Sequence, residues 1–226
     1  MPGELRAVLF DLDGTLVDTE HLWWQAYAEV TARLGGTATD ADAEFVYGRT
    51  IDQAAGHLLR RLRGLPADPA CPSPAGETPP AGEGDAERDR VAELLTHAYA
   101  ARLARGFPVL PGALELLDAL AGERIATGLV TASPRWITDA VLGVLGPHRF
   151  QVTVTADDTP RGKPAPDPYL LAMAGLGVGP AQCVAIEDSP TGAASARAAG
   201  CAVLLVARGG LAEVDPARLR AFIGDH

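Results

Sequence analysis

The chain has 226 residues, of which 47% are hydrophobic and 21% charged, and its formal net charge is −10. This composition is typical of a globular protein with one core, or with a core domain and an insertion. The acidic balance disfavours nucleic acids and anionic membranes as partners, because phosphate-rich surfaces attract Lys and Arg. The three cysteines (Cys71, Cys183 and Cys201) fit neither a disulfide framework nor a zinc site, and no signal peptide or membrane-spanning run is evident, so we expect a cytoplasmic protein with reduced thiols.

The first predicted element is a buried strand over residues 5–10, LRAVLF, which leads directly into two carboxylates. Asp11 and Asp13 are separated by one residue, and Gly14 follows them, where it lets the chain turn sharply. An Asp-Gly pair after a strand is often only a turn. This stretch therefore indicates a site only if other polar groups join it.

Helical patterns follow the first strand, and no second strand pattern occurs for about a hundred residues. Three stretches have apolar residues at helical spacing: 20–35, 50–64 and 89–106. Between the second and third lies a segment rich in proline and glycine, residues 64–87. Such a composition cannot bury enough apolar surface to offset its ordering entropy, so we predict a mobile loop there.

These patterns predict two domains. An all-helical domain over residues 17–105 is expected to be inserted into an α/β domain formed by residues 1–16 and 106–226. The two connections, at 14–18 and 105–111, are rich in turn and hinge residues, so the inserted domain is expected to open and close on them.

The remainder of the chain alternates between strand and helix patterns. Short apolar runs predict strands at 125–131, 150–155, 183–187 and 202–207. Helical spacing recurs at 113–122, 134–146, 166–177 and 189–200. This alternation predicts a parallel, Rossmann-like sheet with right-handed crossovers. The expected fold class is α/β with an inserted all-helical domain.

Polar side chains follow four of the predicted strands. Ligands of open parallel sheets bind beyond the carboxyl ends of the strands, so these side chains are expected to meet at one edge. Besides the first aspartates, they are Thr131, Ser133, Asp157, Asp158, Lys163, Glu187 and Asp188.

Each of these groups alone has a simpler interpretation. Thr131 and Ser133 are typical of a helix cap, and Lys163 of a solvated loop charge. We interpret Asp157 and Asp158 as solvated loop acids, with a role beside the metal left open. The joint placement of the other groups is what indicates a functional site.

The expected crowding of carboxylates requires a cation. Asp11, Asp13, Glu187 and Asp188 would raise one another's pKa values unless positive charge lies among them. Oxygen ligands without clustered His or Cys are typical of Mg²⁺, whose coordination a phosphate oxygen usually completes. Lys163 adds a positive charge, and strand-end hydroxyls add donors. The residues therefore predict a site that holds a phosphoryl group.

Four segments resemble, in order, the signature segments of the haloacid dehalogenase-like (HAD) superfamily: FDLDGTLVDT, LVTAS, GKPAPDPY and IEDSPTGAASARAAG. The helical insertion resembles the cap of the phosphatase and β-phosphoglucomutase-like branch of that family. The resemblance covers nearly the whole chain except residues 64–87. It implies a HAD-like core, Mg²⁺ as cofactor, and hydrolysis of small phosphorylated metabolites.

The resemblance also implies a role for each matching residue. Asp11 matches the nucleophile that forms an aspartyl-phosphate, and Asp13 matches the general acid/base. The groups expected to hold the phosphoryl oxygens are Gly14, Thr131, Ser133 and Lys163. The expected metal ligands are Asp11, Asp13 through its backbone carbonyl, and Asp188, with Glu187 as a supporting acid.

In the helical domain, Trp23 and Arg49 are the expected substrate-binding residues. The stretch YGRTIDQ, residues 47–53, resembles the substrate-facing loop of the cap, where Arg49 would meet a second anionic group. Trp23 stands twelve residues after Asp11, where the β-phosphoglucomutase subgroup has a histidine. The histidines on predicted helices have no evident partner, and we assign no catalytic role to them: His57, His97 and His148.

Two other functions stay open besides the phosphatase. A sugar-phosphate mutase would use the same chemistry, although the tryptophan in place of the subgroup's histidine weakens that interpretation. A phosphorylatable signalling module of the receiver type uses similar groups, but it is shorter and lacks a large helical insertion. The dehalogenase branch lacks the second aspartate and needs no metal. Neither the identity of the substrate nor the choice between monomer and homodimer follows from the sequence.

Overall fold

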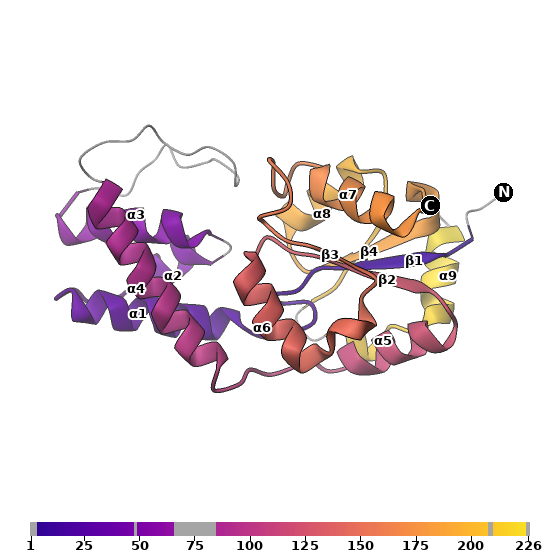
Figure 1. Ribbon diagram of the computed structural model, residues 1–226, viewed down its shortest axis with the longest axis horizontal. Coiled ribbons are helices and arrows are strands. Elements are labelled where there is room, and N and C mark those ends of the chain that lie inside the picture. The colour runs from indigo at the N-terminus through magenta and orange to yellow at the C-terminus, as the bar shows by residue number, and fades with distance from the viewer. Residues whose placement is uncertain (1–3, 48, 66–84, 208–209, 225–226) are drawn as a thin grey trace. The chain divides into compact units, whose positions relative to one another are not determined.

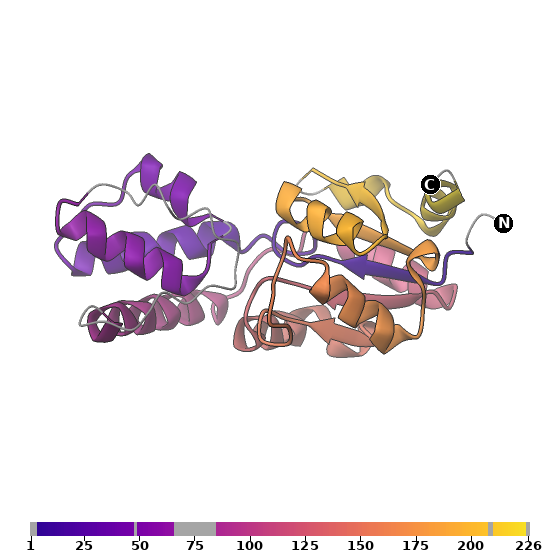
Figure 2. The ribbon, with the colours of Figure 1, turned by 90° about the horizontal axis from the view of Figure 1, so that it is seen from above.

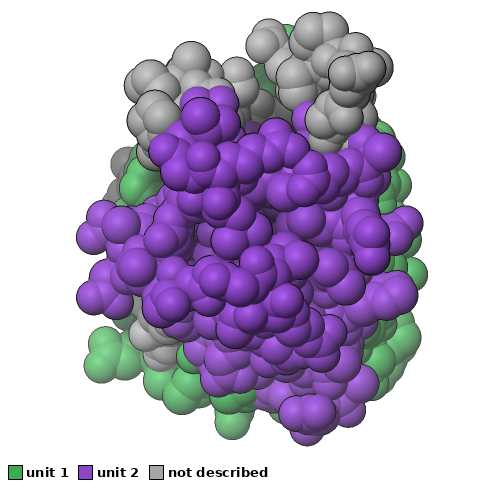
Figure 3. Space-filling view, turned by 90° about the vertical axis from the view of Figure 1, so that its left-hand side faces the viewer, with its two compact units in different colours: residues 1–18, 108–226 green, residues 19–107 purple. Residues whose placement is uncertain are grey.

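The computed structural model describes residues 4–47, 49–65, 85–207 and 210–224. The chain divides into two compact units, coloured separately in Figure 3. We call the first, Met1–Asp18 with Pro108–His226, the α/β unit, and the second, Thr19–Phe107, the helical unit. Cys71 and residues 66–84 of the loop predicted at 64–87 lie outside the described residues.

Five parallel strands form one sheet in the α/β unit, in the order β3-β2-β1-β4-β5 (Figure 1). They are β1 Ala7–Phe10, β2 Ala126–Val130, β3 Val152–Val154, β4 Cys183–Glu187 and β5 Ala202–Leu205. All four residues of the central strand β1 are buried. A parallel strand covered on both faces has no polar side, which explains the uninterrupted apolar run before Asp11.

Helices cover both faces of this sheet. They are α5 Ala113–Gly122, α6 Arg135–Leu145, α7 Asp167–Leu176, α8 Pro190–Ala198 and α9 Pro216–Gly224. The chain runs from β1 outward to β2 and β3 and then crosses to β4 and β5. Right-handed connections therefore place α5 and α6 on one face and α7 and α8 on the other (Figure 1). The predicted α/β fold with a parallel, Rossmann-like sheet is confirmed.

Within its described residues, the helical unit contains four helices (Figure 2): α1 Glu20–Arg33, α2 Asp40–Val46, α3 Ile51–Leu62 and α4 Asp85–Leu103. Both α1 and α3 pack against α4. Helix α4 begins at Asp85, so the C-terminal end of the stretch predicted as a loop is helical. In the described ranges, no helix has the combination of length and apolar character that crossing a bilayer requires.

The two connections between the units run side by side within the α/β unit. Val17 pairs with Val109 in an antiparallel bridge. The Asp18 amide donates to the carbonyl of Pro108, and the Leu110 amide donates to the carbonyl of Leu16, each at 2.9 Å. These bonds tie the first connection to the second just before the chain enters and after it leaves the helical unit.

Candidate active site

The first site segment is a tight turn after β1. The Asp11 amide still donates to the carbonyl of Ile186 on β4, at 3.0 Å, so the sheet fixes the start of the turn. Gly14 follows with a φ of +89°, which side chains rarely adopt. A Cβ at Gly14 would also overlap the carboxylate of Asp188. Glycine is thus required for both the turn and the approach of the acidic group from β4.

Lys163 joins two of these strand ends. Its Nζ donates to Asp11 Oδ1 at 2.7 Å and to Glu187 Oε1 at 2.6 Å. All three side chains are buried, with Glu187 fully enclosed. Burial opposes the charge on Lys163, but the two carboxylates outweigh it and raise the pKa of Lys163 to about 12. The ammonium therefore stays charged between its partners.

Glu187 is held from several sides. Besides Lys163, the Tyr169 hydroxyl donates to Glu187 Oε1 at 2.5 Å, and the Ser189 hydroxyl donates to Oε2 at 3.3 Å. A Cβ at residue 192 would collide with this carboxylate, so Gly192 on α8 leaves the space that it occupies. Glu187 is thereby fixed as the anchor of the lysine.

Three carboxylates gather at this edge, and together they are able to hold a metal ion. One oxygen each from Asp11, Glu187 and Asp188 lies within 4.8 Å of the others. Burial raises the pKa of Asp11 well above its ordinary value, and Glu187 and Asp188 raise it further against the opposing effect of Lys163. Burial and Glu187 raise the pKa of Asp188 to about 6. One ammonium does not balance this cluster.

Asp13 lies beside the strand-end hydroxyls from β2. Its Oδ2 accepts a hydrogen bond from the Ser133 hydroxyl at 2.7 Å. The Ser133 amide in turn donates to Thr131 Oγ1 at 3.0 Å. Pro134, without a capping side chain, is the N-cap of α6, so the interpretation of Ser133 as a helix cap is wrong. Its hydroxyl is used to position Asp13.

Asp157 and Asp158 hold their own loop. The Arg135 amide, at the start of α6, donates to Asp157 Oδ2 at 2.8 Å. Asp158 Oδ2 accepts from both the amide and the hydroxyl of Thr155, each at 2.7 Å, and it pairs with the Arg135 side chain. Neither acid belongs to the carboxylate group that could hold a metal. Both acids therefore have a structural role beyond that of solvated loop charges, because their hydrogen bonds hold the loop after β3 against α6.

The two substrate-binding residues predicted in the helical unit have partners there. Trp23 is 7% exposed, its indole Nε1 donates to the carbonyl of Val46 at 3.1 Å, and its ring meets Tyr99 edge to face. This packing accounts for Trp23 without a ligand. The guanidinium of Arg49 lies 5.4 Å from the centre of the Phe45 ring. A ligand contact by Arg49 stays a prediction.

Three residues that shape the site do not stand out in the sequence. Tyr169, Ser189 and Gly192 all contact or make room for Glu187. Tyr169 stands six residues after Lys163 and Gly192 five after Glu187, both inside segments that the family resemblance includes. Helical periodicity alone assigns such positions to packing, so only the resemblance could have pointed to them.

The chain is similar to known proteins both in sequence and in fold. A family model described as haloacid dehalogenase-like hydrolase matches residues 5–200. The chain is 34% identical to hexitol phosphatase A of Escherichia coli K12, over 89% of this chain and 82% of that protein. It is 33% identical to validoxylamine A 7'-phosphate phosphatase of Streptomyces hygroscopicus subsp. limoneus, over 86% and 82%. Its fold resembles β-phosphoglucomutase from Clostridium difficile, with a TM-score of 0.77 and 21% identity over 98% of both chains.

Proposed function

Because this chain belongs to the haloacid dehalogenase-like hydrolase family, we propose that it is a Mg²⁺-dependent phosphatase of small phosphorylated sugars or polyols. The observation that carries the proposal is the cluster at the edge of the sheet, where Lys163 bridges Asp11 and Glu187. Asp13 lies two residues after Asp11 on the same turn, with its side chain bonded to Ser133. The names of the relatives, which are phosphatases of a hexitol and of a phosphorylated validoxylamine, support the substrate class.

The donor set fits Mg²⁺. Three carboxylates face a single ammonium, all ligand atoms are oxygens, and the absent Cβ of Gly14 leaves room for Asp188. We assign direct ligation to Asp11 and Asp188, with the backbone carbonyl of Asp13 as the family resemblance implies. Both oxygens of Glu187 already accept hydrogen bonds, so its role is to anchor Lys163. When bound, Mg²⁺ would neutralise negative charge on the phosphoryl group and on the carboxylates.

Asp11 is the proposed nucleophile. Lys163 occupies its Oδ1, which leaves the second oxygen for attack on phosphorus. The bond from phosphorus to the sugar oxygen breaks, and an aspartyl-phosphate forms on Asp11. The buried ammonium of Lys163 holds the attacking carboxylate in place and offsets the charge of the transferred group. The Thr131 hydroxyl, which accepts from the Ser133 amide, keeps its own proton to donate to a phosphoryl oxygen.

Asp13 is the proposed general acid and base. In the first half-reaction it gives a proton to the leaving sugar oxygen. In the second it takes a proton from the water that attacks the aspartyl-phosphate, which regenerates Asp11 and releases inorganic phosphate. The hydrogen bond from Ser133 fixes the orientation of Asp13 for both transfers. A group that only stored phosphate would not need this second acid.

Purified protein tests the proposal directly. With Mg²⁺ it should release phosphate from a panel of sugar and polyol phosphates, and Asp13→Asn should lower the turnover by about 10²–10⁴-fold. An exposed acid of the same unit gives the matched control, and Asp139→Asn should keep the wild-type rate. No release from any substrate of the panel would refute the phosphatase.

The mutase alternative is separated by following β-glucose 1-phosphate with NMR. Isomerisation without phosphate release would establish the mutase, and hydrolysis alone would establish the phosphatase. The structure gives the mutase no added support, since Trp23 is enclosed at the position of the subgroup's histidine. The likeness to β-phosphoglucomutase, at 21% identity, concerns the fold.

A further inference from the structure

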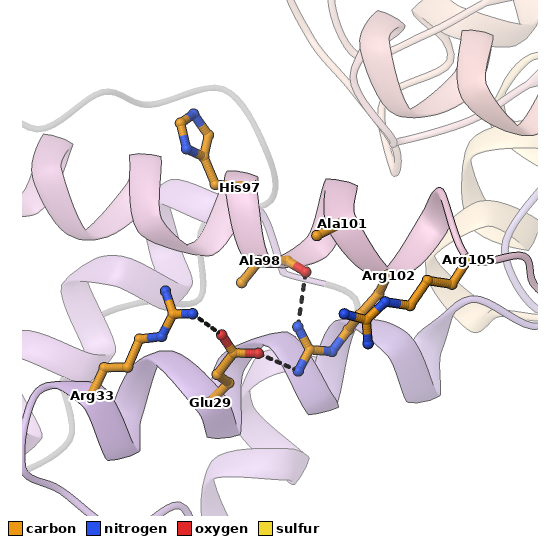
Figure 4. A pocket seen from close by; sticks show the side chains of 7 residues that line it. All are labelled: Glu29, Arg33, His97, Ala98, Ala101, Arg102 and Arg105. Carbon is orange, nitrogen blue, oxygen red and sulfur yellow. Dashed lines mark hydrogen bonds and ion pairs between the residues drawn. The ribbon is translucent and has the colours of Figure 1, made fainter.

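The helical unit contains a cavity of about 260 Å³ that the site chemistry does not use (Figure 4). Its wall comes from α1, from α4 and from the residues just beyond α4. Ala98, Ala101 and His97 also line it, and the small side chains of the two alanines leave the space open. Around that space stand three arginines and one carboxylate: Arg33, Arg102, Arg105 and Glu29.

Positive charge is in surplus in this cavity. Arg33 and Arg102 both pair with Glu29, the latter at 2.6 Å. Arg102 also donates to the carbonyl of Ala98 at 2.9 Å, so two bonds fix its guanidinium. The amide of Arg105 donates to the carbonyl of Arg102 at 2.9 Å, but its guanidinium forms no hydrogen bond or ion pair within the part of the chain that the structure describes. Glu29 is thus the one carboxylate among three guanidinium groups of this cavity, and it pairs with two of them. Hydrogen bonding from Arg102 lowers the pKa of Glu29.

Several arginines elsewhere in the described residues are each paired with a single acid. Such pairs are Arg63 with Glu87, Arg149 with Asp118, and Arg220 with Glu123. The surplus also stands out against a chain whose net charge is −10. Basic residues are favoured in the last turn of a helix, which accounts for Arg33 on α1 and Arg102 on α4. It does not account for Arg105, which lies beyond the last residue of α4.

We propose that this cavity binds a phosphate group, carried by inorganic phosphate or by a small phosphate ester. Guanidinium groups offer paired N–H donors that match the spacing of phosphate oxygens, and two uncompensated charges suit a dianion. The volume falls below the range of about 300–1,000 Å³ that drug-sized ligands occupy, so the ligand is small. The site is built from residues other than those at the sheet edge and does not depend on their chemistry.

NMR of the arginine side-chain Nε–H groups, with inorganic phosphate as the probe, tests the proposal. At constant ionic strength, the signals of Arg102 and Arg105 should shift along a saturating curve. Arg105→Gln should raise the Kd for phosphate, read from the Arg102 signal, by about tenfold, because it removes one charged donor. Ala101→Leu should abolish the shift by filling the space. Arg63→Gln, which removes a paired arginine of the same unit, should leave the curve unchanged.

A non-hydrolysable phosphonate separates the two sources of the phosphate group. Tighter binding of 2-hydroxyethylphosphonate than of phosphate would identify an organic ester as the ligand, and equal or weaker binding would identify inorganic phosphate. The proposal is overturned if the shifts grow linearly, if sodium chloride reproduces them, or if Arg105→Gln and Ala101→Leu both keep the wild-type curve. None of these outcomes depends on phosphatase activity, since the signals report on the helical unit alone.

Discussion

Each unit of the molecule has a buried cluster of charged groups, and the two clusters are balanced differently. In the helical unit, Asp42 is 1% exposed and accepts hydrogen bonds from the amide and hydroxyl of Thr39, at 2.8 and 2.7 Å. These two bonds go to Oδ2 of Asp42, which also pairs with Arg61. His57 Nε2 lies 2.9 Å from the other oxygen, Oδ1. One carboxylate therefore has a complete set of partners. At the edge of the sheet, three carboxylates lie together, and the one lysine among them pairs with two, Asp11 and Glu187.

This difference separates a structural cluster from a functional one. Uncompensated buried charge is costly, so a cluster that only stabilises the fold is expected to be complete within the chain. Charge imbalance persists where a ligand completes it, and functional sites often lower the stability of the fold for this reason. Substitutions at the sheet edge should therefore affect catalysis, and substitutions around Asp42 should affect the stability of the fold.

The largest expected effect is that of Asp11→Asn on catalysis. An amide is not a usable nucleophile, so phosphate release should fall by about 10³-fold or more. Because the substitution removes one of three crowded carboxylates and leaves the pair of Lys163 with Glu187, the melting temperature of the metal-free protein should not fall. Turnover assays and thermal unfolding in EDTA measure the two properties. A large loss of stability would show that Asp11 stabilises the fold, which contradicts an excess of negative charge in this cluster.

Asp42→Ala should produce the opposite result. It leaves His57, Arg61 and Thr39 without their shared acceptor, and we expect the free energy of unfolding of the helical unit to fall by about 3 kcal/mol. Urea unfolding followed by tryptophan fluorescence measures this loss in a Trp136→Phe background, where the two remaining tryptophans, Trp23 and Trp24, both lie in the helical unit. The matched control is Asp40→Ala, an exposed acid on the same helix, with a cost of about 0.5 kcal/mol. Equal losses for both variants would contradict the structural role of Asp42.

The positions of the catalytic candidates could be predicted from the sequence because topology determines them. Carboxyl ends of parallel strands share one edge, so Asp11 and Lys163 meet although 152 residues separate them. The predicted crowding of Asp11, Glu187 and Asp188 is present, whereas the Asp13 side chain turns to Ser133. That detail follows from the geometry of the turn, which periodicity does not describe.

The helical unit was harder to predict. Helix α2 has only seven residues, DADAEFV, too few for a clear helical period. Without α2, nothing in the sequence places Asp42 beside His57, and the prediction that His57 has no partner is wrong. Helix α9 was missed for a similar reason, since nine residues at the end of the chain give a weak pattern. Contacts of this kind depend on how helices pack together, and no local rule specifies them.

An effect of intermediate size is expected when Mg²⁺ is added to or removed from the three carboxylates at the sheet edge. In the metal-free protein the pKa of Asp188 is raised from 3.8 to about 6, so the folded state binds this proton more tightly than the unfolded state. Its contribution to stability is present below about pH 4 and is lost as the pH rises through about 6. Metal binding should offset that loss. Mg²⁺ should therefore raise the melting temperature more at pH 7 than at pH 5.

Asp188→Asn supplies the contrast for this measurement. It should remove most of the Mg²⁺ effect at pH 7 and weaken the dependence of this effect on pH, because the amide does not titrate and only Asp11 remains as a titrating ligand. The exposed acid Asp139 on α6 is the control, and Asp139→Asn should behave as the wild type. A Mg²⁺ effect that is equal at both pH values in the wild type would argue against Asp188 as a ligand.

The smallest expected effect compares two buried tyrosines, one in each unit. The Tyr169 hydroxyl donates to Glu187, the anchor of Lys163, whereas the Tyr27 hydroxyl finds no acceptor or donor among the described residues. Tyr169→Phe should cost about 1 kcal/mol of stability and lower kcat several-fold with little change in KM, because Lys163 loses part of its support. Tyr27→Phe removes a hydroxyl that has no partner, so neither stability nor kcat should fall.

The kinetic result decides what Tyr169 does. A hydroxyl that only stabilised the fold would lower the melting temperature and leave kcat intact at temperatures where the protein is folded. A hydroxyl that positions Lys163 through Glu187 would lower kcat at every such temperature, and Lys163→Arg combined with Tyr169→Phe would then cost less than the two separate losses together. Equal kcat values for Tyr27→Phe and Tyr169→Phe would show that the Tyr169 hydroxyl does not position Lys163.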